Sequence, residues 1–287
     1  MSNRRSAIKI MVAGTAAGVM GSFTLADAKP APKLKGNIKQ SAALWCFKNV
    51  TIDQLCATAK RLGLAGIDLI GPKDWPTLKQ YGLTCTMCNG AENTMIDGWN
   101  TKTNHPELIK RYSDMIELMG KEGYKNLICF SGNRRGIDNE TGMNNCIEGL
   151  KQILPLARKH NVVIMMELIN SKLRYTDYQC DHSAWAVELC KRIDSENFKI
   201  LYDIFHAQVA EGDIVRTIQA NHQYFGHYHT GGLPDRHTMD DTQELNYPAI
   251  MKAILATGYK GYVGQEFVPL EDDKMAELEK AVRYCDV

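Results

Sequence analysis

Residues 199–229 decide the fold, and they read KILYDIFHAQVAEGDIVRTIQANHQYFGHYH. The stretch opens at residues 199–203 with a short run that is typical of a buried strand. A helical period follows at residues 212–220, and a second strand-like run at residues 224–229 completes the unit. A strand, a helix and a strand in this order predict two parallel strands that are joined by a helical crossover.

The same alternation extends along the chain in both directions from this unit. Eight strands are predicted, at residues 42–46, 66–70, 83–87, 126–130, 162–167, 199–203, 224–229 and 262–266. Helical periods lie between them at residues 52–62, 106–122, 143–159, 183–192, 212–220 and 247–256, and one at residues 275–284 closes the chain. We therefore predict an α/β protein, a single-domain (β/α)8 TIM barrel. An open doubly wound sheet would normally carry a glycine-rich phosphate loop after its first strand, and no Gly-x-Gly-x-x-Gly pattern occurs.

The N-terminal segment has the layout of an export signal. Arg4 and Arg5 precede an uncharged stretch over residues 10–25, which ends in a small-residue motif at residues 26–28. The adjacent arginines resemble the twin-arginine export signal, although Ala7 stands where the usual pattern has phenylalanine.

We expect this signal to be cleaved after residue 28, which leaves a linker over residues 29–38 and the barrel over residues 39–287. The mature protein would then be periplasmic or exported, without stable insertion in the membrane. An uncleaved signal would instead anchor the protein, but about sixteen weakly apolar residues are short for the roughly 20 that a spanning helix needs.

The charge balance argues against some classes of partner. The sequence has 34 lysines and arginines against 33 aspartates and glutamates, and it remains near neutral without residues 1–28. A neutral chain has neither the basic footprint of a nucleic-acid-binding protein nor a polybasic patch for membranes. We expect a small-molecule substrate and no nucleic acid, and the sequence leaves open whether the chain forms a homo-oligomer.

Nine cysteines form no disulfide framework of the small secreted kind, and their odd number leaves at least one thiol unpaired. Cys85 and Cys88 have the spacing of a redox motif, but the strand predicted at residues 83–87 places them across a strand end rather than at the start of a helix. We therefore expect neither a redox nor a zinc role for them. The many thiols fit an oxidising compartment poorly, and this is the observation that counts against export.

Four consecutive predicted strands end in side chains that can bind a metal. They are Glu167, Asp203, His229 and Glu266. Because the active site of a (β/α)8 barrel lies at the carboxyl ends of its strands, the four side chains can converge on one point near the barrel axis. Three carboxylates at close range would repel one another unless a cation lay between them. Separate roles as loop acids or capping groups would explain any one of these residues, but not all four in register.

Oxygen ligands with one imidazole suit Mn²⁺ or Mg²⁺, with Co²⁺ as an alternative, and the thiolates of a structural zinc site are lacking. A divalent ion beside a hydroxy-carbonyl compound acidifies its α-proton and neutralises the enediolate that forms. One carboxylate can then remove the proton and another can return it, so we predict Glu167 and Glu266 as the catalytic acid/base pair.

Six motifs extend this interpretation. They are Met166-Glu167-Leu168-Ile169-Asn170, Tyr202-Asp203-Ile204-Phe205-His206, Gly226-His227-Tyr228-His229, Leu233-Pro234-Asp235-Arg236, Leu245-Asn246-Tyr247-Pro248 and Gly264-Gln265-Glu266-Phe267-Val268-Pro269. Together they resemble the hydroxypyruvate isomerase branch of the xylose isomerase-like barrels, from about residue 42 to the C-terminus. The resemblance implies Glu167, Asp203, His229 and Glu266 as metal ligands, and it implies that His206 and Arg236 hold oxygens of the substrate.

Two positions depart from the relatives. His229 resembles the histidine of ketohexose epimerases, where bacterial hydroxypyruvate isomerases have a glutamine. Leu173 stands where those epimerases carry a second substrate-binding acid. The first departure favours an epimerase and the second argues against one, so the substrate stays open.

The leading hypothesis is an intramolecular oxidoreductase of the aldose-ketose type, which acts on a small carbohydrate or hydroxy-keto acid. A sugar epimerase or keto-sugar lyase is the alternative within enzymes, and export favours it because hydroxypyruvate is a cytoplasmic intermediate. A metal-dependent apurinic endonuclease would need a richer metal cluster and basic loops. A carbohydrate-binding barrel without catalysis would not need both Glu167 and Glu266.

Overall fold

The computed structural model describes residues 33–287, and within this range eight parallel strands form a closed barrel in chain order, with β1 paired to β8. The prediction of a single (β/α)8 barrel is confirmed. The strands are β1 (Lys39–Ala43), β2 (Gly66–Ile70), β3 (Thr84–Cys88), β4 (Asn126–Cys129), β5 (Val163–Glu167), β6 (Phe198–Asp203), β7 (Phe225–Thr230) and β8 (Tyr262–Gln265). The predicted signal over residues 1–28 lies outside the described residues, and residues 33–38 of the predicted linker form neither helix nor strand.

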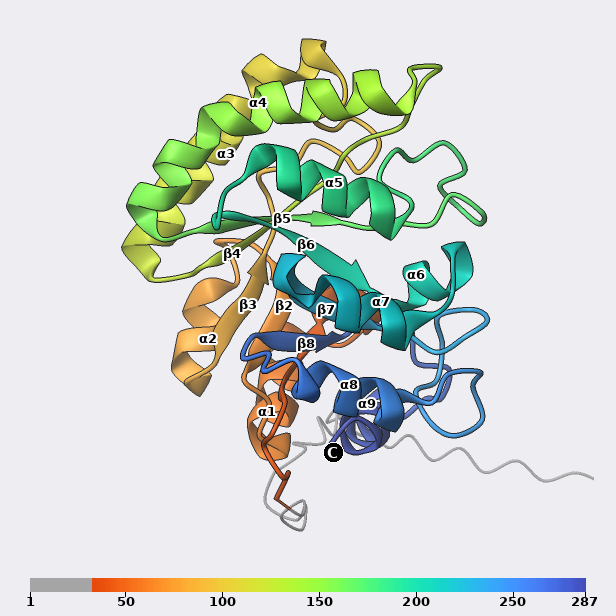
Figure 1. Ribbon diagram of the computed structural model, residues 1–287. Helices are drawn as coiled ribbons and strands as arrows, with labels where there is room; N and C mark the ends of the chain where they lie inside the picture. The colour runs from red at the N-terminus through yellow and green to blue at the C-terminus, as the bar shows by residue number, and fades with distance from the viewer. Residues whose placement is uncertain (1–32) are drawn as a thin grey trace, which may run out of the picture. The chain divides into compact units, whose positions relative to one another are not determined.

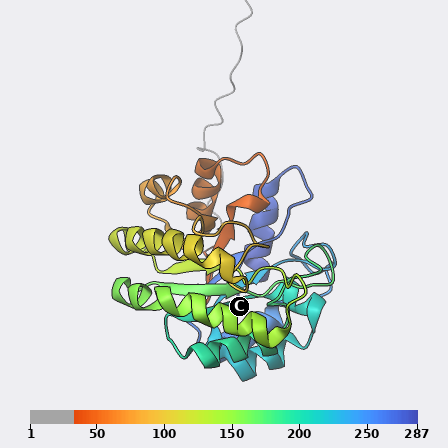
Figure 2. The ribbon, with the colours of Figure 1, turned by 90° about the horizontal axis from the view of Figure 1, so that it is seen from above.

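Helices surround the strands, as Figures 1 and 2 show. They are α1 (Ile52–Leu62), α2 (Trp75–Tyr81), α3 (His105–Glu122), α4 (Asn139–His160), α5 (Ser183–Ile193), α6 (Ile204–Ala210), α7 (Ile214–Asn221), α8 (Tyr247–Ala256) and α9 (Lys274–Tyr284). The arrowheads of β5 and β6 point toward the side where the long loops after β5 and β7 lie (Figure 1), and the other strands run parallel to them in the barrel. This side of the barrel therefore carries the carboxyl ends of the strands, where a barrel enzyme has its active site.

The helices begin and end where local chemistry favours it. Thr51 caps α1, since its hydroxyl accepts a hydrogen bond from the Gln54 amide at 3.2 Å and the Gln54 side chain accepts one from the Thr51 amide at 2.8 Å. Gly63 ends the same helix in the left-handed conformation, with φ of 79°. Such stops turn the chain back toward the next strand after one helix, which is the repeat that builds the barrel.

The first strand lies three residues earlier than the sequence predicts. We expected a strand at residues 42–46, but β1 ends at Ala43 and Leu44–Cys46 forms a 3-10 turn. The true strand begins with polar residues, among them Gln40, whose side chain is buried and bonds to Gln265 at 2.8 Å and to the Val282 carbonyl at 3.0 Å. The prediction was wrong because a buried polar residue with fully satisfied hydrogen bonds leaves no trace in an apolar pattern.

A bulge in β2 determines how Asp68 and Leu69 are placed. Between Asp68 and Ile70 the register with β3 shifts, and the intervening Leu69 adopts a positive φ of 57°. A positive φ is uncommon for a leucine and marks local strain. The bulge keeps Asp68 inside the barrel, where it is fully buried, while the Leu69 side chain lines a cavity at the carboxyl ends of the strands.

Within residues 33–287 no helix is long and apolar enough to cross a membrane. Over the same range all nine cysteines are free and buried. Cys85 and Cys88 both lie within β3, with their sulfur atoms 3.2 Å apart, rather than across the end of a strand as we expected.

Gly66 and Gly71 allow a test of how tightly the barrel is packed. A Cβ at Gly66 would lie 1.9 Å from the Thr84 carbonyl oxygen of the neighbouring strand, whereas a Cβ at Gly71 would make an ordinary contact of 3.5 Å with Asn89. We expect Gly66→Ala to lower the free energy of unfolding by about 1–3 kcal/mol, because the strands must separate. Gly71→Ala is the matched control and should change it by less than about 0.5 kcal/mol. Equal midpoints of urea unfolding for the two variants would contradict this account.

Candidate active site and metal centre

Four strand ends bring the predicted ligands together. Glu167 ends β5, Asp203 ends β6, His229 lies near the end of β7 and Glu266 follows β8. One ligand atom from each lies within 4.8 Å of every other, and all four residues are buried. The structure therefore brings the four predicted side chains together, while their roles as metal ligands stay a prediction.

His229 presents one ring nitrogen to this centre. Its Nδ1 lies 2.6 Å from Glu266 Oε2 and 3.7 Å from Glu167 Oε1, yet it has no partner in hydrogen-bonding geometry. Burial would lower the pKa of His229, but Glu266 and the other nearby carboxylates hold it well above its usual value. The imidazole is thus a cation in the metal-free protein, and an ion bound at Nδ1 would take the place of its proton.

The other ring nitrogen of His229 is held by Asp68, a residue that was not predicted from the sequence. Asp68 Oδ2 lies 3.1 Å from His229 Nε2 and 2.7 Å from His227 Nε2. Its Oδ1 accepts hydrogen bonds from Ser41 at 2.8 Å and from Thr86. Burial alone would raise the pKa of Asp68, but the two histidines hold it below its usual range. A carboxylate on the outer nitrogen of a ligating histidine fixes the ring and raises its basicity.

Two signals in the sequence point to this pair. Asp68 is the one charged residue in an otherwise apolar strand, and His227 lies two positions before His229, so both imidazoles face the barrel interior. Gly264 in the neighbouring strand makes room for them. A Cβ there would lie 2.1 Å from Asp68 Oδ2 and 2.8 Å from His229 Cδ2.

The carboxylates of Asp203 and Glu266 share Arg236 as a partner. Its Nη2 donates to Asp203 Oδ2 and to Glu266 Oε2. The remaining oxygens accept from the His206 amide at 3.1 Å and from Trp45 Nε1 at 2.7 Å. Burial would raise the pKa of Glu266, but the cations of His229 and Arg236 lower it below its usual range. Glu266 is therefore ionised at neutral pH.

Glu167 has a different environment. Within the described residues its carboxylate accepts no hydrogen bond, although its backbone carbonyl accepts one from Tyr178 at 3.2 Å. Burial raises the pKa of Glu167 to about 7 despite the opposing effect of His229, and the charge of Glu266 adds to the rise. Two neighbouring carboxyl groups whose pKa values are pushed apart are a common arrangement for acid/base chemistry.

His206 and Arg236 both line the cavity above the ligands. The Asn170 amide lies 2.6 Å from His206 Nδ1 and donates to it, which leaves the proton on Nε2. Burial lowers the pKa of His206 to about 4, so the ring is a neutral donor. Arg236 has two buried nitrogens, Nε and Nη1, without a partner among the described residues. Both side chains thus have donors free for oxygens of a substrate.

The donor set fits a divalent cation. Three carboxylates and one imidazole point to a common centre, His229 Nδ1 has no other hydrogen-bond acceptor, and Asp68 fixes the ring behind it. Hard oxygen ligands with one nitrogen favour Mn²⁺ or Mg²⁺, with Co²⁺ as an alternative. In the described part of the chain a second group able to hold an ion, formed by Asp68, His227 and His229, shares its last residue with the first. Neither group contains a cysteine.

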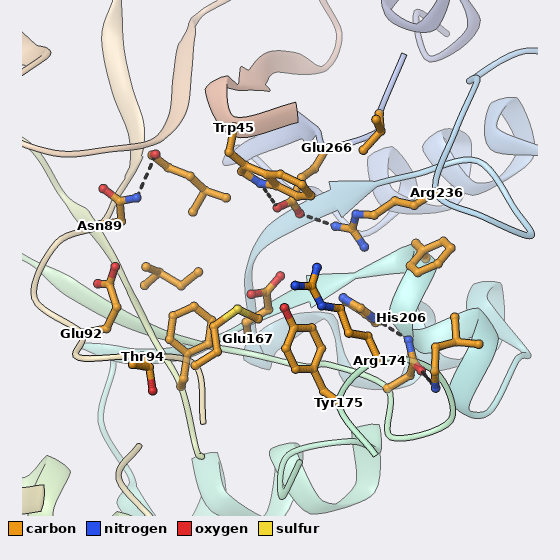
Figure 3. A pocket seen from close by; sticks show the side chains of 18 of the residues that line it. Trp45, Asn89, Glu92, Thr94, Glu167, Arg174, Tyr175, His206, Arg236 and Glu266 are labelled. Atoms are coloured by element: carbon orange, nitrogen blue, oxygen red, sulfur yellow. Dashed lines mark hydrogen bonds and ion pairs between the residues drawn. The ribbon is translucent and has the colours of Figure 1, made fainter. Parts of the chain in front are cut away.

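A cavity of about 680 Å³ opens above the centre (Figure 3). Glu167, Glu266, His206 and Arg236 form its floor, and Trp45 lies at its edge with 53% of its surface exposed. A barrel with buried charged groups at the bottom of such a cavity has the usual form of an enzyme active site.

Comparison with known proteins shows which family of barrels this chain resembles. A family model described as the xylose isomerase-like TIM barrel matches residues 75–285. The chain is 29% identical over 123 residues to the 2-oxo-tetronate isomerase of Cupriavidus necator, which is 43% of this chain and 46% of that protein. It is also 29% identical over 138 residues to the putative hydroxypyruvate isomerase of Danio rerio, 48% of this chain and 50% of that protein. The chain thus matches about half the length of these curated relatives.

A solved structure gives a longer match. The family 2 AP endonuclease of Brucella melitensis is 25% identical, with a TM-score of 0.75 over 84% of this chain and 97% of that one. The similarity covers most of the barrel, and endonuclease is the name of the Brucella protein only.

Asp68 offers a test of the metal centre that does not depend on activity. We expect Asp68→Asn to weaken Mn²⁺ binding roughly 10–100-fold, because His229 loses the acceptor that orients it. Competition with a fluorescent chelator measures the affinity, and circular dichroism checks the fold. Asp114, exposed on α3, gives the control variant Asp114→Asn, which should bind Mn²⁺ as the parent does. An unchanged affinity in a folded Asp68→Asn protein would remove Asp68 from the centre.

Proposed function

The chain belongs to the xylose isomerase-like TIM barrel family, and from this premise we propose that it is a metal-dependent isomerase that interconverts hydroxy-carbonyl compounds through an enediolate. The reaction is an intramolecular oxidoreduction of the aldose-ketose type, on a small carbohydrate or hydroxy-keto acid. The observation that carries the proposal is the pair of buried glutamates, Glu167 and Glu266, at one centre with an imidazole ligand.

The two glutamates divide the acid/base work. In the metal-free protein burial raises the pKa of Glu167 to about 7. Beside a divalent ion Glu167 would have a lower pKa, and its carboxylate would stay ready to accept the substrate proton. Glu266 is held ionised by Arg236, and by the His229 cation or the ion that would replace its proton, and it acts on the neighbouring carbon of the substrate. Their carboxylate oxygens lie within 4.8 Å of each other, which lets both reach one hydroxy-carbonyl group.

Other side chains orient the substrate. The neutral His206 donates through Nε2, and Arg236 donates through the two nitrogens that lack a partner, so the substrate oxygens meet fixed donors. A divalent ion held by Glu167, Asp203, His229 and Glu266 would neutralise the negative charge that develops on those oxygens. The buried floor of the cavity keeps water away from the enediolate.

A sugar epimerase or keto-sugar lyase of the same family is the second candidate. His229 favours it, because this position resembles that of ketohexose epimerases. Leu173 does not, since an exposed leucine replaces their second substrate-binding acid. All of these reactions begin with removal of a proton next to a carbonyl, and the position of solvent deuterium in the product distinguishes them. A carbohydrate-binding barrel without catalysis would show no deuterium at all.

Substitution of the glutamates tests the reaction. We expect Glu167→Gln and Glu266→Gln each to lower the rate of deuterium incorporation by roughly 10²–10⁴-fold, since an amide cannot accept the substrate proton. The measurement is mass spectrometry of ketoses, keto sugars and hydroxypyruvate incubated in D2O with the Mn²⁺-loaded protein. Glu188, a partly exposed residue of α5 outside the cavity, gives the control Glu188→Gln. Full activity in both variants would show that the acid/base pair is wrongly assigned.

We also propose that the chain is exported and that residues 1–28 are removed. The nine free cysteines count less against this than their number implies, because every one is buried. Burial raises the pKa of the Cys129 thiol well above its usual value, and an un-ionised, inaccessible thiol is slow to oxidise.

Fractionation of the source cells tests export. We expect the protein in the periplasmic or extracellular fraction, with an intact mass that corresponds to a chain starting at Lys29. A membrane-bound protein of full length would indicate an uncleaved anchor. A soluble full-length protein in the cytoplasm would contradict export altogether.

A further inference from the structure

The cavity is larger than the reaction requires. Its volume of about 680 Å³ has room for roughly twenty water-sized groups, at about 30 Å³ each. A three-carbon acid bound at Glu167 and Glu266 would fill only a small part of this space. The remainder extends outward between two loops, and its lining residues have no part in the reaction described above.

The first wall is the loop after β3, and it is held rigidly. Arg111 of α3 donates to the Ala91 carbonyl at 3.0 Å, to Asn93 Oδ1 at 2.7 Å and to the Glu92 carbonyl at 2.6 Å. The Glu92 carboxylate itself lines the cavity and accepts only from the amide of Gly90, at 2.8 Å, among the described residues. This acid is therefore fixed in position with one oxygen free.

The second wall is the loop after β5, which Asn170 folds. Its side-chain oxygen accepts from the amides of Lys172 at 3.1 Å and Leu173 at 3.0 Å, while its nitrogen bonds to His206. The same amide thus links the floor of the cavity to its outer wall. Loops that are already ordered lose little entropy when a ligand binds.

Arg174 and Tyr175 project from this wall into the cavity (Figure 3). The Arg174 guanidinium lies over the Tyr175 ring at 5.6 Å, but within residues 33–287 no carboxylate lies close enough to pair with it. The Tyr175 hydroxyl has no hydrogen-bond partner in the same range. Arg174 is exposed and Tyr175 is half-buried, and both line the cavity beside the reacting groups, so their free donors are available to a ligand.

The charges disfavour an anionic ligand. Three carboxylates, Arg236 and a divalent ion sum to zero on the floor of the cavity. Arg174 balances Glu92 on the walls, and Asp235, which also lines the cavity, adds one negative charge. Donors on one side, an acceptor on the other and the exposed indole of Trp45 at the edge suit a polyhydroxylated ring, which presents hydroxyls at its rim and C–H groups on its faces.

We propose that Glu92, Arg174 and Tyr175 form an outer subsite for a second sugar unit, so that the substrate is a neutral carbohydrate of disaccharide size with a hydroxy-carbonyl group at its reacting end. The inference rests on the proposed function, and it adds the substrate class. It makes Arg174 and Tyr175 determinants of specificity, whereas Glu167 and Glu266 determine the reaction.

Keto-disaccharides test the subsite against a monosaccharide with the same reacting end. Lactulose, maltulose and isomaltulose each carry one further sugar on D-fructose, in three different linkages. The measured quantity is kcat/KM for deuterium incorporation by the Mn²⁺-loaded protein. We expect its value for the best of the three disaccharides to be at least tenfold higher than for D-fructose. Calorimetric titration should give the same order of affinities without turnover.

Variants of the loop after β5 test whether Arg174 and Tyr175 cause the preference for disaccharides. Arg174→Ala and Tyr175→Phe should each lower kcat/KM for the best disaccharide about tenfold, and leave D-fructose and hydroxypyruvate within about twofold, because only the disaccharide reaches them. Lys172 lies on the same loop, is exposed and does not line the cavity, so Lys172→Ala is the matched control.

The outcomes separate the subsite from the reaction. Equal kcat/KM for D-fructose and every disaccharide, or an equal loss for hydroxypyruvate in Arg174→Ala, overturns the outer subsite while the proposed reaction stands. A disaccharide preference in calorimetry without any deuterium incorporation supports the subsite and overturns the reaction. If neither a disaccharide preference nor deuterium incorporation is found, the outer subsite and the proposed reaction are both overturned.

Discussion

The contact between His229 and the buried carboxylate of Asp68 is the interaction on which the candidate centre depends. Asp68 holds one nitrogen of the ring, so the other must face the carboxylates of Glu167 and Glu266. A histidine free to rotate could not keep Nδ1 aimed at one point. The absence of a side chain at Gly264 is part of the same constraint, since any Cβ there would push Asp68 and His229 apart.

Closure of the barrel supplies the other half of the arrangement. Parallel strands that close on themselves bring all their carboxyl ends to one rim, so Glu167, Asp203 and His229 approach one another although a whole strand-helix unit separates each from the next. The two glutamates at this rim lie in different environments. Glu266 is surrounded by cations and stays ionised, whereas Glu167 lacks hydrogen-bond donors and has a raised pKa. One fold thus gives two carboxyl groups different properties at the same centre.

The cavity above this centre has two regions with different constraints. The floor is built from strand ends and is rigid because the barrel is rigid. The outer walls are loops, and each is held by one side chain that forms several hydrogen bonds to backbone, Arg111 on one side and Asn170 on the other. Such loops can change their exposed residues, such as Arg174, without disturbing the chemistry below. In the proposed enzyme, substrate choice and reaction type therefore reside in different parts of the molecule.

The sequence by itself determined the barrel and the four candidate ligands, because the alternation of strands and helices is local and because strand ends in such a fold must meet. It misplaced β1, since Gln40 is polar and its buried hydrogen bonds are made to residues far along the chain. It missed Asp68 and His227 because a lone charge in a strand and a second inward-facing histidine do not show which residues they contact. The tertiary structure alone decided that Asp68 in β2 faces β7, that Arg236 bridges Asp203 and Glu266, and that Arg174 reaches the cavity. Contacts of this kind depend on the distances between side chains after the barrel has closed, and no local pattern of residues encodes them.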